Sequence, residues 1–381
     1  MKTARKCEIK IRRMKMKKFK FLKKKMISLA LMTVLGVTAL TGCGSNDPST
    51  VKAKNDDSNT VVQENTDADK AEEASQDKTE AAPEKSGKVI RIAAQAYPLY
   101  SPINAAYELG YFDEEFDAIG ASYTWTEFAS GPLVNETIAA GEGDVGFMAD
   151  LPAIIARSSG QDIQVVSGVS TGERSLAVLV RADSDIKDIK ELKGKKIAYA
   201  SGSYAQHLLA LVLDQAGLTF DDIESINLGA ADSPAALANG DVEAIVIWEQ
   251  FITKLTNDGT ARVLIDGTGI KKSNMILYSV KDFAEQNPEL IEAFIKATNR
   301  GAEYIKNNPK EAAELLAKKY SVTAEEMEKI FGNFNFSVTL TDDDVAEIVK
   351  VADYAYQAGI ISNPVNGDEF INRDYLKKAG Y

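Results

Sequence analysis

Residues 125–152 read WTEFASGPLVNETIAAGEGDVGFMADLP, and they contain the unit on which the predicted fold is built. Residues 122–128 are rich in aromatic and Thr side chains, which is typical of a strand. Ser130 offers a side-chain oxygen to cap a helix, and Pro132 falls in the first turn, where no N–H is needed. After two glycines, the apolar run 145–148 predicts a buried strand. The stretch therefore predicts a strand, a helix and a strand.

The same order recurs about a hundred residues later. Residues 223–251 read IESINLGAADSPAALANGDVEAIVIWEQF, with a helix start at Asp232 and Pro234 and an apolar run at 244–248. This repetition indicates two lobes of one architecture. Alternating strands and helices favour parallel-rich sheets with helices on both faces. Beyond residue 282 the periodicity predicts a helical tail, with helices over 288–304, 309–320, 323–334 and 342–358.

The first 43 residues predict export and lipidation. Residues 1–25 are strongly basic, and the apolar run 26–40 is shorter than the ~20 residues that span a bilayer, as in a secretory signal. Leu-Thr-Gly-Cys at 40–43 resembles a bacterial lipobox, which implies diacylglycerol on the Cys43 sulfur and cleavage before it. The alternative is an ordinary signal with an incidental cysteine. Translation from Met16 instead of Met1 would give a signal of more ordinary length.

Charge and composition restrict the function of the remaining chain. Of 44 basic and 56 acidic residues, 13 and one precede Cys43, so 31 basic and 55 acidic residues follow, a net charge of −24. Such an acidic body is a poor candidate for nucleic-acid binding. The chain has two cysteines, Cys7 in the signal and Cys43, and one histidine. We therefore expect no disulfide, no metal site and no cofactor.

These patterns divide the chain into four parts. Residues 1–42 are the predicted signal peptide. Residues 43–87, which lack aromatic side chains, are too polar to bury a core and predict a disordered tether. We assign residues 88–180 together with 275–381 to lobe 1, and residues 181–274 to lobe 2.

Three stretches resemble the binding proteins of sulfonate, taurine and nitrate ABC importers. They are FASGPLVNETIAAGEGDVGFMADLP at 128–152, LKGKKIAYASGSYAQHLLALVLDQAGL at 192–218 and ALANGDVEAIVIWEQF at 236–251. The resemblance implies a class II periplasmic-binding-protein fold, in which two Rossmann-like lobes enclose a ligand cleft. It also implies a monomeric receptor on the extracytoplasmic face of the membrane, whose partners are a small anion and the permease and ATPase subunits.

Helix N-termini provide a physical basis for holding an anion without a cation, because their first N–H groups are unpaired and carry partial positive charge. The helices after Ser130 and Ser201 would supply one such end from each lobe, and closure would bring both to one ligand. Alternatively, both serines are only helix caps, and His207 and Trp248 belong to the core. The predicted ligand-binding residues are Gln95, Tyr97, Ser130, Gly131, Pro132, Asp150, Gly202, Ser203, Tyr204, His207 and Trp248.

Other functions remain as alternatives. His207 follows Ser203 by four residues, but no orienting acid or Gly-x-Ser-x-Gly elbow accompanies them, so a serine hydrolase is not favoured. Thiamine-pyrimidine synthases related to the family need clustered cysteines, which are absent after Cys43. We therefore expect no catalytic residue. A receptor for a pyrimidine precursor or another small heterocycle, or a sensor that does not transport, remains open.

The lipobox leads to a direct test of anchoring. We expect Cys43→Ser to abolish incorporation of labelled palmitate, because the acceptor sulfur is lost, and to leave the precursor unprocessed. Label retained on the variant would contradict the prediction.

Overall fold

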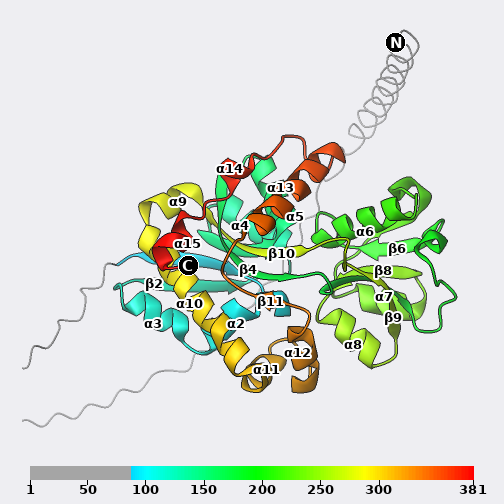
Figure 1. Cartoon of the computed structure of the whole chain (residues 1–381), viewed down its shortest axis with the longest axis horizontal. Helices are drawn as coiled ribbons and strands as arrows, with labels where there is room; N and C mark the ends of the chain where they lie inside the picture. Colours follow the sequence, from blue (N-terminus) through cyan, green and yellow to red (C-terminus); the bar gives the residue numbers. More distant parts are fainter. Residues whose placement is uncertain (1–86) are drawn as a thin grey trace, which may run out of the picture. The chain divides into compact units, whose positions relative to one another are not determined.

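Two β-sheets organise residues 87–381, which are the residues that the computed structural model describes (Figure 1). All of them belong to one compact unit of the chain. The predicted signal peptide, Cys43 and the tether up to residue 86 lie outside the described residues. Within 87–381, no helix is long and apolar enough to cross a membrane.

The first sheet has the strand order β11-β4-β10-β3-β1-β2. Its strands are β1 (Val89–Ala94), β2 (Ser122–Glu127), β3 (Val145–Ala149), β4 (Ile163–Gly172), β10 (Ser273–Val280) and β11 (Asn335–Phe336). The elements that connect them are η1 (Pro98–Tyr100), α2 (Ser101–Glu108), α3 (Tyr111–Asp117), α4 (Gly131–Ala139) and α5 (Asp150–Ser158). We call this sheet and the helices that pack on it the first lobe.

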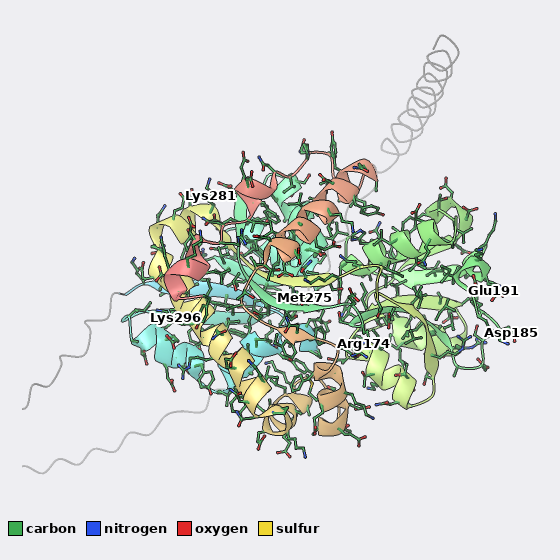
Figure 2. All side chains as sticks on the ribbon, in the orientation of Figure 1. Arg174, Asp185, Glu191, Met275, Lys281 and Lys296 are labelled. Carbon is green, nitrogen blue, oxygen red and sulfur yellow. The ribbon has the colours of Figure 1, made fainter. Side chains whose placement is uncertain are left out.

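The second sheet has the strand order β7-β6-β8-β5-β9. Its strands are β5 (Leu176–Arg181), β6 (Lys196–Tyr199), β7 (Glu224–Asn227), β8 (Ala244–Trp248) and β9 (Ala261–Asp266). Its connections contain η2 (Ile189–Leu192), α6 (Tyr204–Gln215), η3 (Phe220–Asp222), α7 (Ser233–Asn239) and α8 (Phe251–Asn257). In Figure 2, Asp185 and Glu191 lie at the end of this second lobe that is far from the first.

The two sheets share one topology. Five strands of the first sheet have counterparts at the same positions in the second sheet. In order across the sheets, β2, β1, β3, β10 and β4 correspond to β7, β6, β8, β5 and β9. In both lobes the first three strands are parallel, the fourth (β10 or β5) is antiparallel to them, and the fifth (β4 or β9), antiparallel to the fourth, returns to the first direction. Four of these five strands in each sheet therefore share one direction, as the prediction of parallel-rich sheets requires, and the one reversed strand makes each sheet mixed. The reversed strands, β10 and β5, are those on which the chain enters a lobe after crossing from the other one, where no helical crossover within the sheet imposes a parallel direction.

The chain crosses between the lobes at two places. The first crossing follows β4 and occupies residues 173–175, because β5 already pairs with β8 and β9. The predicted boundary at residue 180 is therefore wrong by one strand. The apolar run of β5 indicates burial on both faces, but it carries no information about which sheet buries it. The return crossing, 267–272, separates β9 from β10.

Alternation along β5 and β8 shows how the second sheet is buried on both faces. Val178 and Val246 belong to the large core cluster, whereas Leu179 and Ile245, one position along, belong to a separate cluster on the opposite face. Trp248 lies two residues after Val246 on the same strand, so both side chains point to the face of the large cluster. Helices therefore cover both faces of this sheet.

The C-terminal helices pack mainly on the first lobe (Figure 1). They are α9 (Lys281–Gln286), α10 (Pro288–Asn307), α11 (Pro309–Ala317), α12 (Ala324–Phe331), α13 (Asp342–Gln357), α14 (Gly367–Phe370) and α15 (Asp374–Ala379). The four predicted helices of the tail correspond to α10, α11, α12 and α13. The long helix α10 approaches α2 so closely that a Cβ on Gly301 would lie 2.0 Å from the Pro102 carbonyl oxygen.

Gly301 gives a test of this packing. Alanine is normally the better helix former by about 1 kcal/mol. Here we expect Gly301→Ala to lower the free energy of unfolding by about 2 kcal/mol or more, because the methyl group would force α10 away from α2. Urea denaturation measures the change. Glu303→Ala, at an exposed position of the same helix, should stay within about 0.5 kcal/mol of the parent. An unchanged or raised stability for Gly301→Ala would contradict the close approach.

Candidate functional site

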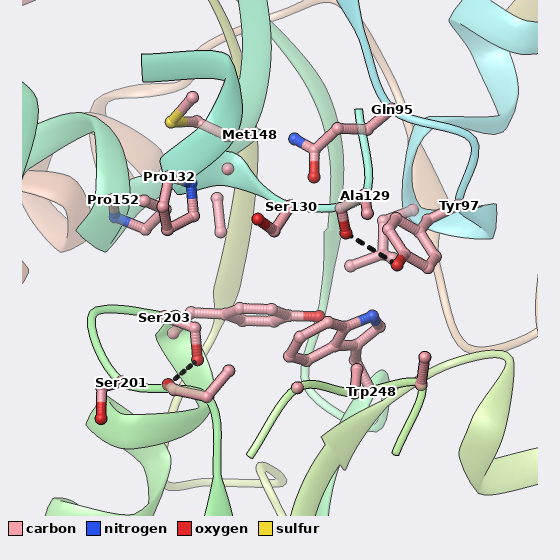
Figure 3. Close-up of a pocket in the computed structure, with 18 of the residues that line it drawn as sticks. Gln95, Tyr97, Ala129, Ser130, Pro132, Met148, Pro152, Ser201, Ser203 and Trp248 are labelled. Carbon is pink, nitrogen blue, oxygen red and sulfur yellow. Dashed lines mark hydrogen bonds between the residues drawn. The ribbon is translucent and has the colours of Figure 1, made fainter. Parts of the chain in front are cut away.

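A cavity of about 350 Å³ lies between the two lobes. It is lined by the carboxyl ends of β3, β7 and β8 and by the loops that follow β1, β2, β6 and β7. This edge is where open α/β sheets place ligands, because helix N-termini point toward it. Figure 3 shows Gln95, Ser130 and Pro132 on the side of the first lobe, and Ser201, Ser203 and Trp248 on the side of the second.

Eight of the eleven predicted ligand-binding residues line this cavity. They are Gln95, Tyr97, Ser130, Gly131, Pro132, Ser203, Tyr204 and Trp248. Asp150, Gly202 and His207 do not line it. Whether the eight residues bind a ligand stays a prediction.

In the first lobe, the N-terminus of α4 offers free donors. Ser130 has extended backbone (φ −161°, ψ 158°) at the N-cap position, but its side chain accepts no capping hydrogen bond. The predicted capping role of Ser130 is therefore wrong, and its hydroxyl lines the cavity instead. Among the described residues, the N–H groups of Gly131 and Leu133 have no partner, since the first bond runs from Val134 N to Ser130 O at 3.3 Å. An acceptor in the cavity could satisfy them.

In the second lobe, the loop after β6 uses several of its donors internally. Ser203 Oγ accepts from Ala205 N at 3.2 Å and donates to the Ala200 carbonyl at 2.7 Å. Gly202 N donates to the Gln206 side chain at 2.8 Å. Ser201 N donates to the side chain of Asn227 at 3.0 Å. Gly202 adopts φ +73°, so its role is to make this turn. The Ser201 and Gly202 N–H groups and the Ser203 hydroxyl are therefore already bonded within the second lobe.

Aromatic side chains join the two lobes across the cavity. The Tyr97 ring meets the Trp248 indole edge-on, with ring centroids 6.2 Å apart, and Tyr97 Oη donates to the Ala129 carbonyl at 2.8 Å. Tyr204 also packs against Trp248, with ring centroids 5.4 Å apart. Tyr204 Oη is buried without a partner among the described residues, and burial raises its pKa, so it remains a protonated donor. Trp248 is 7% exposed and serves both core and cavity.

Gln95 is held rigidly at the cavity wall. Its side-chain nitrogen donates to the Phe147 carbonyl at 2.7 Å, which ties the loop after β1 to β3. Asn104 Nδ2 donates to the Gln95 backbone carbonyl at 3.2 Å. Tyr100 lines the cavity beside it, and burial raises the pKa of its hydroxyl. Such fixed polar groups set the orientation of a ligand.

Among the described residues that line the cavity, Asp232 alone has a formally charged side chain. Asp232 and its neighbours Asn227 and Gly229 line the cavity, but the sequence analysis did not select them. The sequence repeat could have identified these residues, because the loop after β7 occupies the position in lobe 2 that the Ser130 loop occupies in lobe 1. The Arg174 side chain does not line the cavity and donates to the Gly332 carbonyl at 2.8 Å. Within 87–381, no cluster of residues is suited to a metal ion.

Two predicted residues belong to the packing behind the cavity. Asp150 is fully buried, with Lys271 Nζ 3.1 Å from its carboxylate. His207 is also buried, and its ring stacks on Tyr354 of α13 with centroids 4.3 Å apart and an interplanar angle of 23°. Burial, together with the nearby positive charges of Lys271 and Lys350, lowers the pKa of His207 to about 2. The imidazole is therefore neutral at physiological pH.

His207 predicts a pH dependence of stability. The unfolded chain takes up a proton near pH 6.5, whereas folded His207 does not, so the free energy of unfolding falls as the pH falls. Between pH 7 and pH 5 this contribution is about 2 kcal/mol. His207→Phe preserves a ring against Tyr354 and should remove this contribution. Urea denaturation at both pH values measures it, with Tyr354→Phe as a control that retains the histidine. Equal pH dependence in the parent and His207→Phe would contradict the assignment.

Comparisons with known proteins agree with this architecture. Residues 97–312 match the family described as "NMT1/THI5 like". A "Putative aliphatic sulfonates-binding protein" from Bacillus subtilis is 30% identical over 295 residues, which cover 77% of this chain and 88% of the relative. The alkanesulfonate-binding protein SsuA from Xanthomonas axonopodis pv. citri, solved bound to MOPS, superposes with a TM-score of 0.69 at 26% identity, covering 77% of this chain and all of that chain.

A further relative is named as an enzyme. The 4-amino-5-hydroxymethyl-2-methylpyrimidine phosphate synthase of Legionella pneumophila is 25% identical over 225 residues, which cover 58% of this chain and 69% of the relative. Binding proteins and a synthase thus share this fold, so the family alone does not assign the activity. From the family match over more than half of the chain and the similarity to the Bacillus protein, we conclude that the protein belongs to the NMT1/THI5-like family.

Proposed function

We propose that the protein is the solute-binding component of an ABC importer and that its ligand is a small organic anion of the sulfonate class. Cys43 would carry a lipid anchor that holds the monomeric receptor at the extracytoplasmic face of the membrane. The loaded receptor would deliver its ligand to a permease that is driven by an ATPase subunit. The names of the Bacillus and Xanthomonas relatives support this assignment.

The observation that carries the proposal is the free N-terminus of α4 at a cavity between two lobes. Two unpaired N–H groups, those of Gly131 and Leu133, lie at the positive end of this helix. A sulfonate has three acceptor oxygens and one delocalised negative charge, which matches a small set of convergent N–H donors. The Tyr204 hydroxyl and the Ser130 hydroxyl add donors that a ligand oxygen could use.

The size and chemistry of the cavity favour an organic anion over nitrate. A volume of about 350 Å³ is in the range of small-molecule sites, and is large for a four-atom ion. Side chains such as Leu99, Met148, Pro152 and Trp248 provide apolar surface for a hydrocarbon part. Burying that part contributes about 25 cal/mol per Å² of apolar area. The donors would hold the head group, and the apolar side chains would hold the remainder.

Ligand capture would depend on closure of the lobes. The Tyr97 loop belongs to the first lobe and Trp248 to the second, so their edge-on contact forms only when the lobes approach. A ligand that touches both sides binds the closed arrangement more tightly and therefore shifts the population toward it. The permease would recognise this closed state.

The two tryptophans of the chain allow a matched test. Trp248 lines the cavity, whereas Trp125 stacks on Tyr107 at 4.3 Å and does not line it. We expect 1-butanesulfonate or MOPS to change the intrinsic fluorescence of the parent and of Trp125→Phe, but not of Trp248→Phe. The physical reason is that a ligand in the cavity displaces water from the Trp248 indole only.

Thermal denaturation with the same ligands completes this test, because a ligand that binds only the folded state raises the melting temperature. Nitrate and 4-amino-5-hydroxymethyl-2-methylpyrimidine serve as competing ligands. Stabilisation by the pyrimidine alone would reject the sulfonate assignment in favour of a heterocycle receptor. A fluorescence change that persists in Trp248→Phe would place the ligand outside the cavity.

A further inference from the structure

We propose that Glu249 is a positioning residue that slows the release of the ligand, because its buried carboxylate bonds to Asn333 and stabilises the closed arrangement of the lobes. The inference rests on the proposed function, since it concerns the ligand that closure would retain. Glu249 does not line the cavity, but it directly follows Trp248, which does. It would therefore act on the ligand through its neighbour and through the position of the second lobe.

Glu249 is fixed at the boundary between the second lobe and the first crossing. It lies directly after β8 and is completely buried. Its backbone N–H donates to the carbonyl of Ser175, in the first crossing, at 3.0 Å. Within the second lobe, Glu249 Oε2 accepts from Thr253 N and Oε1 accepts from Thr253 Oγ1, both at 3.0 Å, at the start of α8. These bonds hold the carboxylate in place without a contribution from the first lobe.

A further donor to the carboxylate comes from the first lobe. Asn333 Nδ2 donates to Glu249 Oε1 at 2.7 Å. Asn333 belongs to the segment between α12 and β11, and its own N–H donates to the Ile330 carbonyl at 2.9 Å. Its carbonyl oxygen packs on the end of β4, since a Cβ on Gly172 would lie 2.4 Å from it. The Asn333 side chain therefore extends from the first lobe to the second, where α12 and α8 lie side by side (Figure 1).

The contact with Asn333 favours the closed lobes because no cation is paired with the carboxylate. In the described part of the chain, Glu249 forms hydrogen bonds and no ion pair. When the lobes open, water can take the place of the Asn333 amide, whereas in the closed arrangement the buried carboxylate is inaccessible to water. Loss of the Asn333 donor would therefore destabilise the closed arrangement selectively. Release of the ligand requires opening, so its dissociation would become faster while its association changes little.

The rates of ligand exchange test the inference. Stopped-flow measurement of tryptophan fluorescence with 1-butanesulfonate gives the observed rate at each ligand concentration. The slope of this dependence is the association rate constant, and its intercept is the dissociation rate constant. We expect Asn333→Ala to raise the dissociation rate constant about tenfold, as for the loss of one charge-assisted hydrogen bond, and to leave the association rate constant unchanged.

Two further variants control this measurement. Glu249→Gln combined with Asn333→Asp exchanges the charge and the donor, so the introduced amide can donate to the introduced carboxylate at the same place. This double variant should restore the slow dissociation of the parent. Asn257→Ala removes another contact between α8 and α12, an exposed hydrogen bond to Glu326 Oε1 at 3.3 Å, and should leave both rate constants unchanged.

The outcomes separate this inference from the proposed function. If Asn333→Ala releases 1-butanesulfonate at the rate of the parent, or if the double variant releases it as fast as Asn333→Ala, the role of Glu249 is overturned and the sulfonate receptor stands. A lower melting temperature of Asn333→Ala with unchanged dissociation would show that the contact only stabilises the fold. Equal acceleration by Asn257→Ala would also overturn the role of Glu249. If no sulfonate binds to the parent, the proposed function fails and the inference fails with it.

Discussion

A buried ion pair between Asp150 and Lys271 lies at the point where the second lobe returns to the first. Both side chains are completely buried, and Nζ lies 3.1 Å from the carboxylate. Losing either partner would leave an unpaired charge in the interior, which costs about 3–5 kcal/mol. The pair therefore holds the return crossing against the end of β3. Beside it, a Cβ on Gly267 would lie 2.4 Å from the Glu173 carbonyl oxygen, so the two crossings are in direct contact. This junction makes the ligand-binding edges of both sheets face one cavity.

Contacts between the lobes outside the junction set the cost of opening. Glu249 follows Trp248 in the second lobe, and its buried carboxylate accepts from Asn333 Nδ2 at 2.7 Å and from Thr253 N at 3.0 Å. Burial raises the pKa of Glu249, and the hydrogen bonds from Thr253 and Asn333 oppose this shift. The stack of His207 on Tyr354 joins α6 to α13 on the other side. Opening the cavity would expose or separate these groups together, which favours two discrete states over a continuous motion.

The duplicated topology contains two different binding surfaces. At equivalent positions, the first lobe has Ser130 after β2, before a helix with free N–H groups, and the second has Asp232 after β7, before a short helix. The fold thus fixes where the loops lie, while the loop sequences decide the sign of the charge that each presents. Only the tertiary structure brings both loops, with these local differences, to the lining of one cavity.

The sequence by itself determined the elements and the approximate place of the site. The apolar runs at 176–180 and 244–248 indicated buried strands, and Pro132 indicated a helix start, because burial on both faces and helix entry are local properties. Only the tertiary structure decided which sheet receives β5, that the Ser130 hydroxyl makes no cap, and that Asp232 lines the cavity whereas Asp150 does not. These outcomes depend on partners distant in the sequence, and a local pattern carries no information about such partners.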